Sequence, residues 1–169
     1  MNALILGIIS VLVIVAGFFG YSQLSPNAPY FFQDGEEQSE ELFKGAVLDL
    51  GGRGLTSVSQ DTFTQNNIIE LDLSDNALTG SLPAEVRHLK NLIVLDLSGN
   101  QFTGVPAEVG QLSELEVLDL SYNRLTGLPY ELGNLSHLKI LDLRGNDYAE
   151  ADLAIIREKL PTNVEIRVD

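Results

Sequence analysis

The sequence predicts an α/β solenoid in which short parallel strands stack into one β-sheet. Three observations predict it: a Leu-Asp-Leu phrase that occurs five times, a constant interval between its copies, and an asparagine at a fixed place after most of them. The phrase begins at residues 48, 71, 95, 118 and 141, so the intervals are 23, 24, 23 and 23 residues. A fixed period of about 20–29 residues with leucines in this rhythm is typical of solenoid proteins.

Each Leu-Asp-Leu phrase is expected to form a short strand. Alternate residues of a strand point to opposite faces. In the second copy Leu71 and Leu73 therefore face the interior, whereas Glu70, Asp72 and Ser74 face out. Stacking places equal positions of successive repeats side by side, so the outward residues form three columns on the concave face of the sheet.

An asparagine ladder is expected where the chain turns after each strand, because this side chain can satisfy backbone groups that a turn leaves unpaired. The ladder consists of Asn76, Asn100, Asn123 and Asn146. Arg53 interrupts it in the first repeat, which we expect to be a looser edge.

The convex side is predicted to be irregular or 3-10 helix. A Thr-Gly dipeptide and a proline follow the asparagine in three repeats, at 79–83, 103–106 and 126–129. Glycine and proline favour turns and oppose a continued strand. One inward-facing apolar residue comes next in each of these repeats, namely Val86, Val109 and Leu132.

Both ends of the solenoid are expected to carry caps, because a repeat cannot bury its apolar side alone. Residues 149–160 predict a C-terminal helix with one apolar face formed by Leu153, Ile156 and Leu160. Pro161 ends this helix, and the alternating residues 164–168 predict a last strand. Residues 36–44 predict a short N-terminal capping helix.

Residues 92–102, 115–125 and 138–148 share the pattern L-x-x-L-x-L-x-x-N-x-L, with Phe102 and Tyr148 at its last position in two copies, and the chain from 42 to 169 thereby resembles the leucine-rich repeat family. The 24-residue unit resembles the plant-type subclass, and the 23-residue units resemble bacterial or generic repeats. The resemblance implies a parallel sheet on the concave face and a function in protein–protein contact.

Residues 1–33 contain no charged residue or histidine, and residues 3–21 are almost wholly apolar. As a helix, the 19 residues 3–21 would span about 28 Å, close to the hydrocarbon thickness of a bilayer. The sequence therefore predicts a transmembrane anchor at 1–22, a linker at 23–35, and a domain of five repeats plus caps at 36–169. A cleaved signal peptide is the alternative for 1–22, although a basic residue before its apolar core is missing.

The anchor predicts a single-pass cell-membrane protein with its repeat domain outside, or a secreted protein if the segment is cleaved. The middle column of the concave face holds Asp72, Asp96, Asp119 and Asp142. One interpretation is a negative stripe that attracts a basic protein segment, and the other is that aspartate is simply common in these repeats. The net charge of −14 disfavours nucleic acid as a partner.

The first column contains Val94, Val117 and Ile140, which the alternation predicts to be outward-facing and apolar. They are expected either to contact a partner or to pack against one another. The third column offers small residues and then a base, in the order Ser98, Ser121 and Arg144. The predicted protein-binding residues are Asp72, Val94, Asp96, Ser98, Val117, Asp119, Ser121, Ile140, Asp142 and Arg144.

Enzymatic activity is not expected. The sequence lacks the glycine-rich phosphate-binding motifs and shows no serine with histidine and aspartate partners at a suggestive spacing. His88 and His137 are 49 residues apart and are predicted to lie on the surface, so no metal or cofactor is predicted.

The leading functional hypothesis is a membrane-tethered, outward-facing module that recognises a protein or peptide on its concave face. Such a module would work with a co-receptor or an envelope complex. The alternative is a structural envelope or surface spacer that packs against like chains.

Overall fold

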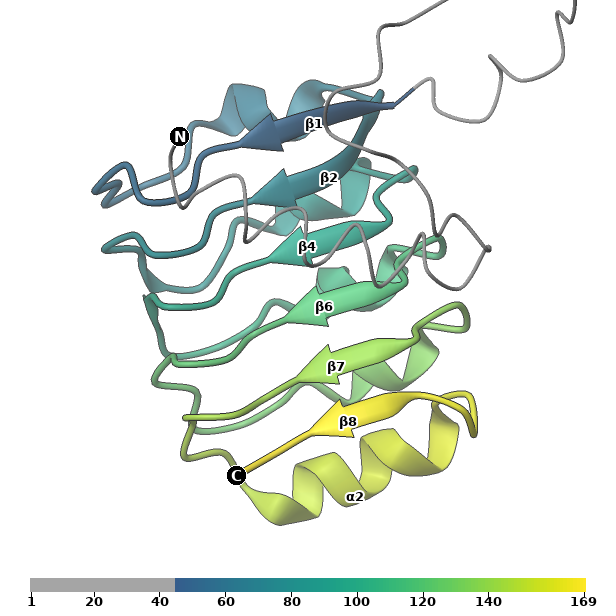
Figure 1. The fold of residues 1–169 in the computed structure, drawn as a ribbon. Helices are drawn as coiled ribbons and strands as arrows, with labels where there is room; N and C mark the ends of the chain where they lie inside the picture. Colours follow the sequence, from purple (N-terminus) through teal and green to yellow (C-terminus); the bar gives the residue numbers. More distant parts are fainter. Residues whose placement is uncertain (1–44) are drawn as a thin grey trace, which may run out of the picture. The chain divides into compact units, whose positions relative to one another are not determined.

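The computed structural model describes residues 45–169, which lie within one compact unit, Phe43–Asp169. Its main element is a six-stranded parallel sheet in the order β1-β2-β4-β6-β7-β8 (Figure 1). The strands are β1 (Ala46–Asp49), β2 (Ile68–Asp72), β4 (Val94–Asp96), β6 (Val117–Asp119), β7 (Ile140–Asp142) and β8 (Glu165–Arg167). The predicted parallel sheet, one strand per repeat, is confirmed.

The strands pair in the register that the repeat period predicts. Leu95 lies beside Leu71 on one neighbour and beside Leu118 on the other, and the aspartates of the middle column follow the same rule. A slip of one residue would move each leucine to the opposite face of the sheet, so burial of the leucines fixes this register. The aspartates are thereby held side by side on the concave face.

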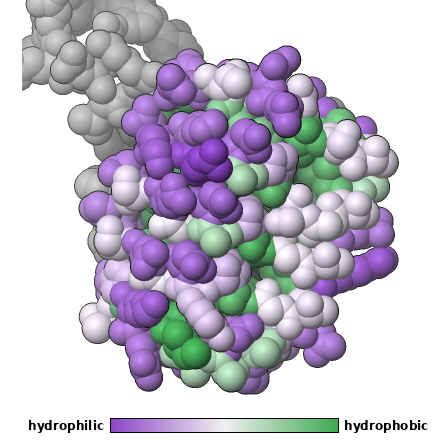
Figure 2. All heavy atoms as spheres, turned by 180° about the vertical axis from the view of Figure 1, so that it is seen from behind, coloured by the Kyte–Doolittle hydropathy of each residue, from purple (hydrophilic) through white to green (hydrophobic). Residues whose placement is uncertain are grey.

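The convex side is formed by short 3-10 helices, as predicted. These are η1 (Gln60–Thr64), η2 (Ala84–His88), η3 (Ala107–Gln111) and η4 (Tyr130–Asn134). A proline occupies the position before η2, η3 and η4, where its fixed φ suits the start of a helix. Seen from this side, polar residues cover much of the surface and hydrophobic residues show between them (Figure 2).

The prediction that glycine and proline exclude strand from the segment after the asparagine is wrong in two repeats. There β3 (Thr79–Gly80) pairs in parallel with β5 (Gln101–Phe102) to form a second, two-stranded sheet. The N–H of Gln101 donates to the carbonyl of Leu78 at 2.9 Å, and that of Thr103 to Gly80 at 2.8 Å. Stacking at a constant period aligns these backbones, so even a turn segment can pair with its copy.

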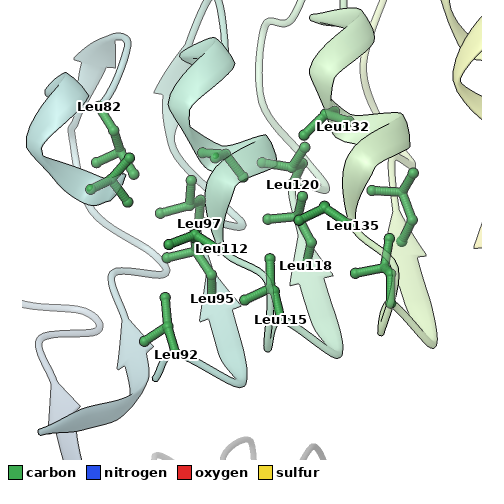
Figure 3. Packing of buried hydrophobic residues seen from close by; sticks show 14 of the residues in the cluster. Leu82, Leu92, Leu95, Leu97, Leu112, Leu115, Leu118, Leu120, Leu132 and Leu135 are labelled. Carbon is green, nitrogen blue, oxygen red and sulfur yellow. The ribbon is translucent and has the colours of Figure 1, made fainter. Parts of the chain in front are cut away.

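Leucines fill the space between the sheet and the 3-10 helices (Figure 3). Leu95 and Leu118 project from the strands, Leu97 and Leu120 from the positions just after them, and Leu112 and Leu135 meet them from the ends of the helices. The helices contribute Val86, Val109 and Leu132, which are also fully buried, as predicted.

The asparagine ladder is confirmed at all four predicted positions. In each case the side-chain Oδ1 accepts a backbone N–H from the preceding repeat, and Nδ2 donates to carbonyls of both repeats; Asn76, Asn100, Asn123 and Asn146 share this pattern. In the first repeat Arg53 instead donates through its guanidinium to the carbonyl of Asp49. Asn76 serves that repeat too, because its Oδ1 accepts from the N–H groups of Arg53 and Leu55.

The C-terminal cap is confirmed. Helix α2 (Glu150–Lys159) buries Leu153, Ile156 and the following Leu160, and it closes the end of the solenoid beside β8 (Figure 1). The predicted N-terminal capping helix, linker and transmembrane anchor lie outside the described residues. Within 45–169, the structure contains no helix long and apolar enough to cross a membrane.

Candidate functional site

The aspartates of the concave face have a structural task in addition to their charge. In every copy, aspartate Oδ1 accepts a hydrogen bond from the backbone N–H two residues later. The distances are 3.0 Å for Asp49, 2.8 Å for Asp72, 2.9 Å for Asp96, 2.9 Å for Asp119 and 3.2 Å for Asp142. Such a bond turns the backbone at the end of the strand, which explains why the residue recurs.

Two serines of the third column strengthen this arrangement. The hydroxyl of Ser98 donates to Asp96 Oδ1 at 2.7 Å, and that of Ser121 donates to Asp119 Oδ1 at 2.6 Å. Hydrogen bonds to a carboxylate are shorter and stronger than neutral ones. Neither serine offers a free hydroxyl on this column, because both hydroxyls are used, and Ser121 is also buried.

The predicted exposure of the first column is wrong for its central residues. Val94, Val117 and Ile140 are only 4–6 % exposed, although they point away from the leucine core, whereas Val47 is 49 % exposed. Pairing in register places the three side chains next to one another on adjacent strands. They form a continuous apolar row, and Val47 is the open member of the column.

The aspartates also differ in burial. Asp96 and Asp119 are half-buried, whereas Asp72 is buried and Asp142 is fully buried. Burial raises the pKa of Asp96 to about 7, and the charge of Asp119 adds to this effect, while the hydrogen bonds from Ser98 oppose it. Burial likewise raises the pKa of Asp119, against the hydrogen bonds from Ser121. The middle of the column therefore holds its negative charge at a cost in stability.

Replacing Asp96 with asparagine is expected to raise the free energy of unfolding by about 2 kcal/mol above pH 7, with the gain vanishing near pH 4. The carboxyl has a raised pKa in the folded state, so the wild-type fold retains a proton between about pH 4 and 7 that the unfolded chain releases. Wild-type stability consequently falls as the pH rises through this window. Urea unfolding of Asp96→Asn and wild type at both ends of the window measures the difference.

The matched control for this prediction is Glu114→Gln, because Glu114 is exposed and lies away from the sheet. It should change stability by less than about 0.5 kcal/mol at either pH. Parallel pH curves for wild type and Asp96→Asn would contradict the prediction.

The C-terminal end of the concave face pairs its buried acid with two bases. Arg144 donates from Nε to both carboxylate oxygens of Asp142, at 3.0 and 3.1 Å, and from Nη2 to Oδ2 at 2.6 Å. Arg167 Nη1 lies 3.8 Å from the same carboxylate. This end of the face is less acidic than its middle, because these arginines neutralise Asp142.

Tyr122 is a candidate contact residue that the sequence reasoning missed. It is 60 % exposed and follows Ser121 at the margin of the concave face. Its φ is +54°, in the left-handed region, where the equivalent positions Gly99 and Gly145 have +64° and +68°. A residue with a side chain costs about 1–2 kcal/mol there, and exposed tyrosine is a frequent binding hot spot. The signal in the sequence is a tyrosine where the adjacent repeats have glycine.

The two histidines are exposed, as predicted. His137 Nδ1 lies 2.7 Å from the carbonyl oxygen of Ser113, so its ring is bound to a neighbouring turn. Among residues 45–169, no group of three or more His, Asp or Glu side chains is placed to hold a metal ion.

A family assignment follows from the repeat geometry and from sequence comparison. The sequence model of the family described as "Leucine rich repeat" matches residues 46–102 and 90–147, together more than half of the chain. The chain belongs to the leucine-rich repeat family. The family's fold is typically a non-enzymatic scaffold for protein interaction, which agrees at this general level with the expectation that the chain is not an enzyme.

Two solved leucine-rich repeat structures illustrate the likeness. A leucine-rich repeat protein of Leptospira interrogans is 37 % identical with a TM-score of 0.61, and the match covers 66 % of this chain and 28 % of that one. The BIR3–SERK2 complex from Arabidopsis thaliana contains a chain that is 30 % identical with a TM-score of 0.58, and the match covers 72 % of this chain and 66 % of that one.

Sequence relatives match over a shorter part of the chain. The exoribonuclease subunit Ccr4 of the CCR4-Not complex of Schizosaccharomyces pombe is 48 % identical over 62 residues, which are 37 % of this chain. This leucine-rich repeat chain spans only 9 % of the length of that relative.

Proposed function

We propose that this leucine-rich repeat chain is a membrane-tethered recognition module that binds a protein or peptide segment on its concave face, outside the cell. The observation that carries the proposal is the continuous six-stranded sheet, whose register aligns side chains of equal position into columns. A similar chain occurs in the BIR3–SERK2 complex, an assembly of two proteins. The charge-free residues 1–33 support the tether.

The chemistry of the face favours a basic segment that crosses the strands. One oxygen of each half-buried aspartate is used within its own turn, as in Asp96 and Asp119, and a basic group at the second oxygen would favour the charged form of a carboxyl whose pKa burial has raised. Val47 offers apolar contact at the start of the sheet, and Tyr122 offers an aromatic ring beside Arg144. A binding segment would therefore combine lysine or arginine with a residue that stacks on tyrosine.

A peptide library displayed on phage and panned over intact cells that carry the full chain tests this function. The expected result is enrichment of peptides rich in lysine and arginine. Their binding should fall about tenfold in the double variant Asp96→Asn with Asp119→Asn, because each lost ion pair contributes up to about 1 kcal/mol. Tyr122→Gly should also weaken binding, while it relieves the backbone strain at that position.

The matched control replaces two exposed acids outside the strands, Glu114→Gln with Glu131→Gln, which changes the net charge equally and should leave binding intact. Equal losses in both double variants would show that binding follows net charge alone, against a concave-face site. Protease added to the same cells should remove the repeat domain, and a protected domain would contradict the outward placement.

A further inference from the structure

The C-terminal edge of the sheet is an open strand whose backbone groups are partly unused by the solenoid. The sheet order places β8 at the edge. The N–H of Glu165 donates to Lys139 at 2.8 Å, and the carbonyl of Arg167 accepts from Leu143 at 2.9 Å, so these two residues serve the ladder to β7. In a parallel strand the alternate residue presents its N–H and C=O to the other side. Ile166 therefore presents its backbone groups to the open edge.

The sequence of this edge strand alternates apolar and charged residues symmetrically about Ile166. Residues 164–168 have the order Val, Glu, Ile, Arg, Val. We propose that β8 pairs with β8 of a second copy of this chain, antiparallel and about a two-fold axis through Ile166. In that register each Glu165 lies opposite Arg167 of the second copy, and each Val164 lies opposite Val168. Opposite charges and apolar pairs across two antiparallel strands are both stabilising.

The charges at this edge select the antiparallel arrangement. Charged residues on a short edge strand usually prevent pairing. Here a parallel pairing of two β8 strands would place like charges beside each other, whereas the antiparallel one joins Glu165 and Arg167 twice. Both side chains are accessible for this, with 60 % and 30 % exposure, and Arg167 Nε already contacts Glu165 Oε1 at 2.7 Å within the strand. The two-fold axis also gives a closed dimer, the commonest symmetric assembly.

The inner side of the same edge has a hollow that the second copy could cover. This hollow of about 450 Å³ lies between the end of α2 and β8; Leu160, Pro161, Val164 and Ile166 form its apolar part, and Arg157, Glu158 and Thr162 form its polar part. Val168 is 42 % exposed, although the alternation along the strand makes it an inward-facing residue. The antiparallel register places Val168 of the second copy opposite Val164, at this hollow. Dimerisation would thus cover apolar surface at the C-terminal end that the cap leaves open.

Sedimentation of the full chain over a range of concentrations tests the dimer. Wild type should associate reversibly, and Glu165→Arg, which leaves Arg167 beside Asp142, should weaken association about tenfold or more because two attractive pairs become repulsive. Arg167→Glu should weaken it similarly, and circular dichroism must show that its fold is kept, because Arg167 also faces the buried Asp142. A mixture of these two variants should regain the wild-type affinity as a heterodimer, since every opposing pair is again one acid and one base. The doubly reversed chain, Glu165→Arg with Arg167→Glu, should likewise dimerise.

Two outcomes of sedimentation would overturn the proposal. One is a wild-type chain that stays monomeric throughout the range. The other is association that persists unchanged in both single variants, since the contact would then lie elsewhere in the chain.

A cysteine cross-link tests the register independently. The chain contains no cysteine, and the two-fold axis would bring the Cα atoms of position 166 to about 5.5 Å, within the range of a disulfide. Ile166→Cys should therefore form a disulfide-linked dimer on mild oxidation. Ile155→Cys, at an exposed position on α2, is the control and should remain unlinked. Equal cross-linking of both variants would contradict the antiparallel register.

Discussion

Replacing Asn123 with alanine is expected to destabilise the domain by about 3 kcal/mol or more. Its Oδ1 accepts from the N–H of Phe102 at 3.0 Å, and its Nδ2 donates to the carbonyl of Leu97 at 2.9 Å. Nδ2 also donates within its own repeat, to Leu120 and Ser121, both at 3.1 Å. Each buried backbone group left unpaired costs about 1–3 kcal/mol. Urea unfolding monitored by circular dichroism measures the loss.

The matched control for Asn123→Ala is Asn134→Ala, because Asn134 is exposed at the end of η4. This change should alter stability by less than about 0.5 kcal/mol. A similar small loss for Asn123→Ala would mean that the ladder is dispensable and that leucine packing alone sets the spacing of the repeats.

Replacing Gly110 with alanine is expected to cost about 3 kcal/mol. A Cβ at this position would lie 2.2 Å from the carbonyl oxygen of Glu131, so the backbones of η3 and η4 would have to separate. Overpacking in a rigid interior costs about 1–3 kcal/mol, and a clash with backbone falls at the upper end because no side chain can rotate away. Thermal unfolding should show a lower midpoint for Gly110→Ala.

Gly104 provides the matched control for this steric prediction. A Cβ there would meet no atom within 4 Å, and its φ is not positive. Gly104→Ala should therefore be neutral or slightly stabilising, because it restricts the unfolded chain. Equal losses at both glycines would indicate a propensity effect instead of close contact between the 3-10 helices.

The repeat period predicted most of the fold. Leucine alternation specified the strands, the constant 23- or 24-residue spacing specified their parallel stacking, and Asn100 and Asn123 proved to be ladder residues. These features are predictable because each depends on a local pattern that every repeat must satisfy in the same way. The break in the pattern after Asn146 similarly predicted the helix and strand of the C-terminal cap.

The candidate site was predicted less completely. Alternation correctly placed Val94 and Val117 on the concave side, but their burial depends on neighbours 23 residues away in the chain, beside which stacking places them. The hydrogen bond from Ser98 to Asp96 likewise required the backbone geometry at the end of the strand. Tyr122 was not among the predicted contact residues, although the sequence has a tyrosine where the adjacent repeats have glycine; its positive φ is a property of the folded backbone.

The direction in which each strand residue points was therefore set by the order of amino acids, since the strand repeats every two residues. Tertiary stacking decided which outward-facing residues are exposed to solvent, which carboxylates lower the stability of the fold when they are charged, and which edge of the sheet remains unpaired. Burial and electrostatics are sums over neighbours from several repeats, so they appear only once the repeats have been brought together. The alternating charges of β8 likewise depend on the tertiary structure, because they can pair with a second copy only if β8 lies at the edge of the sheet.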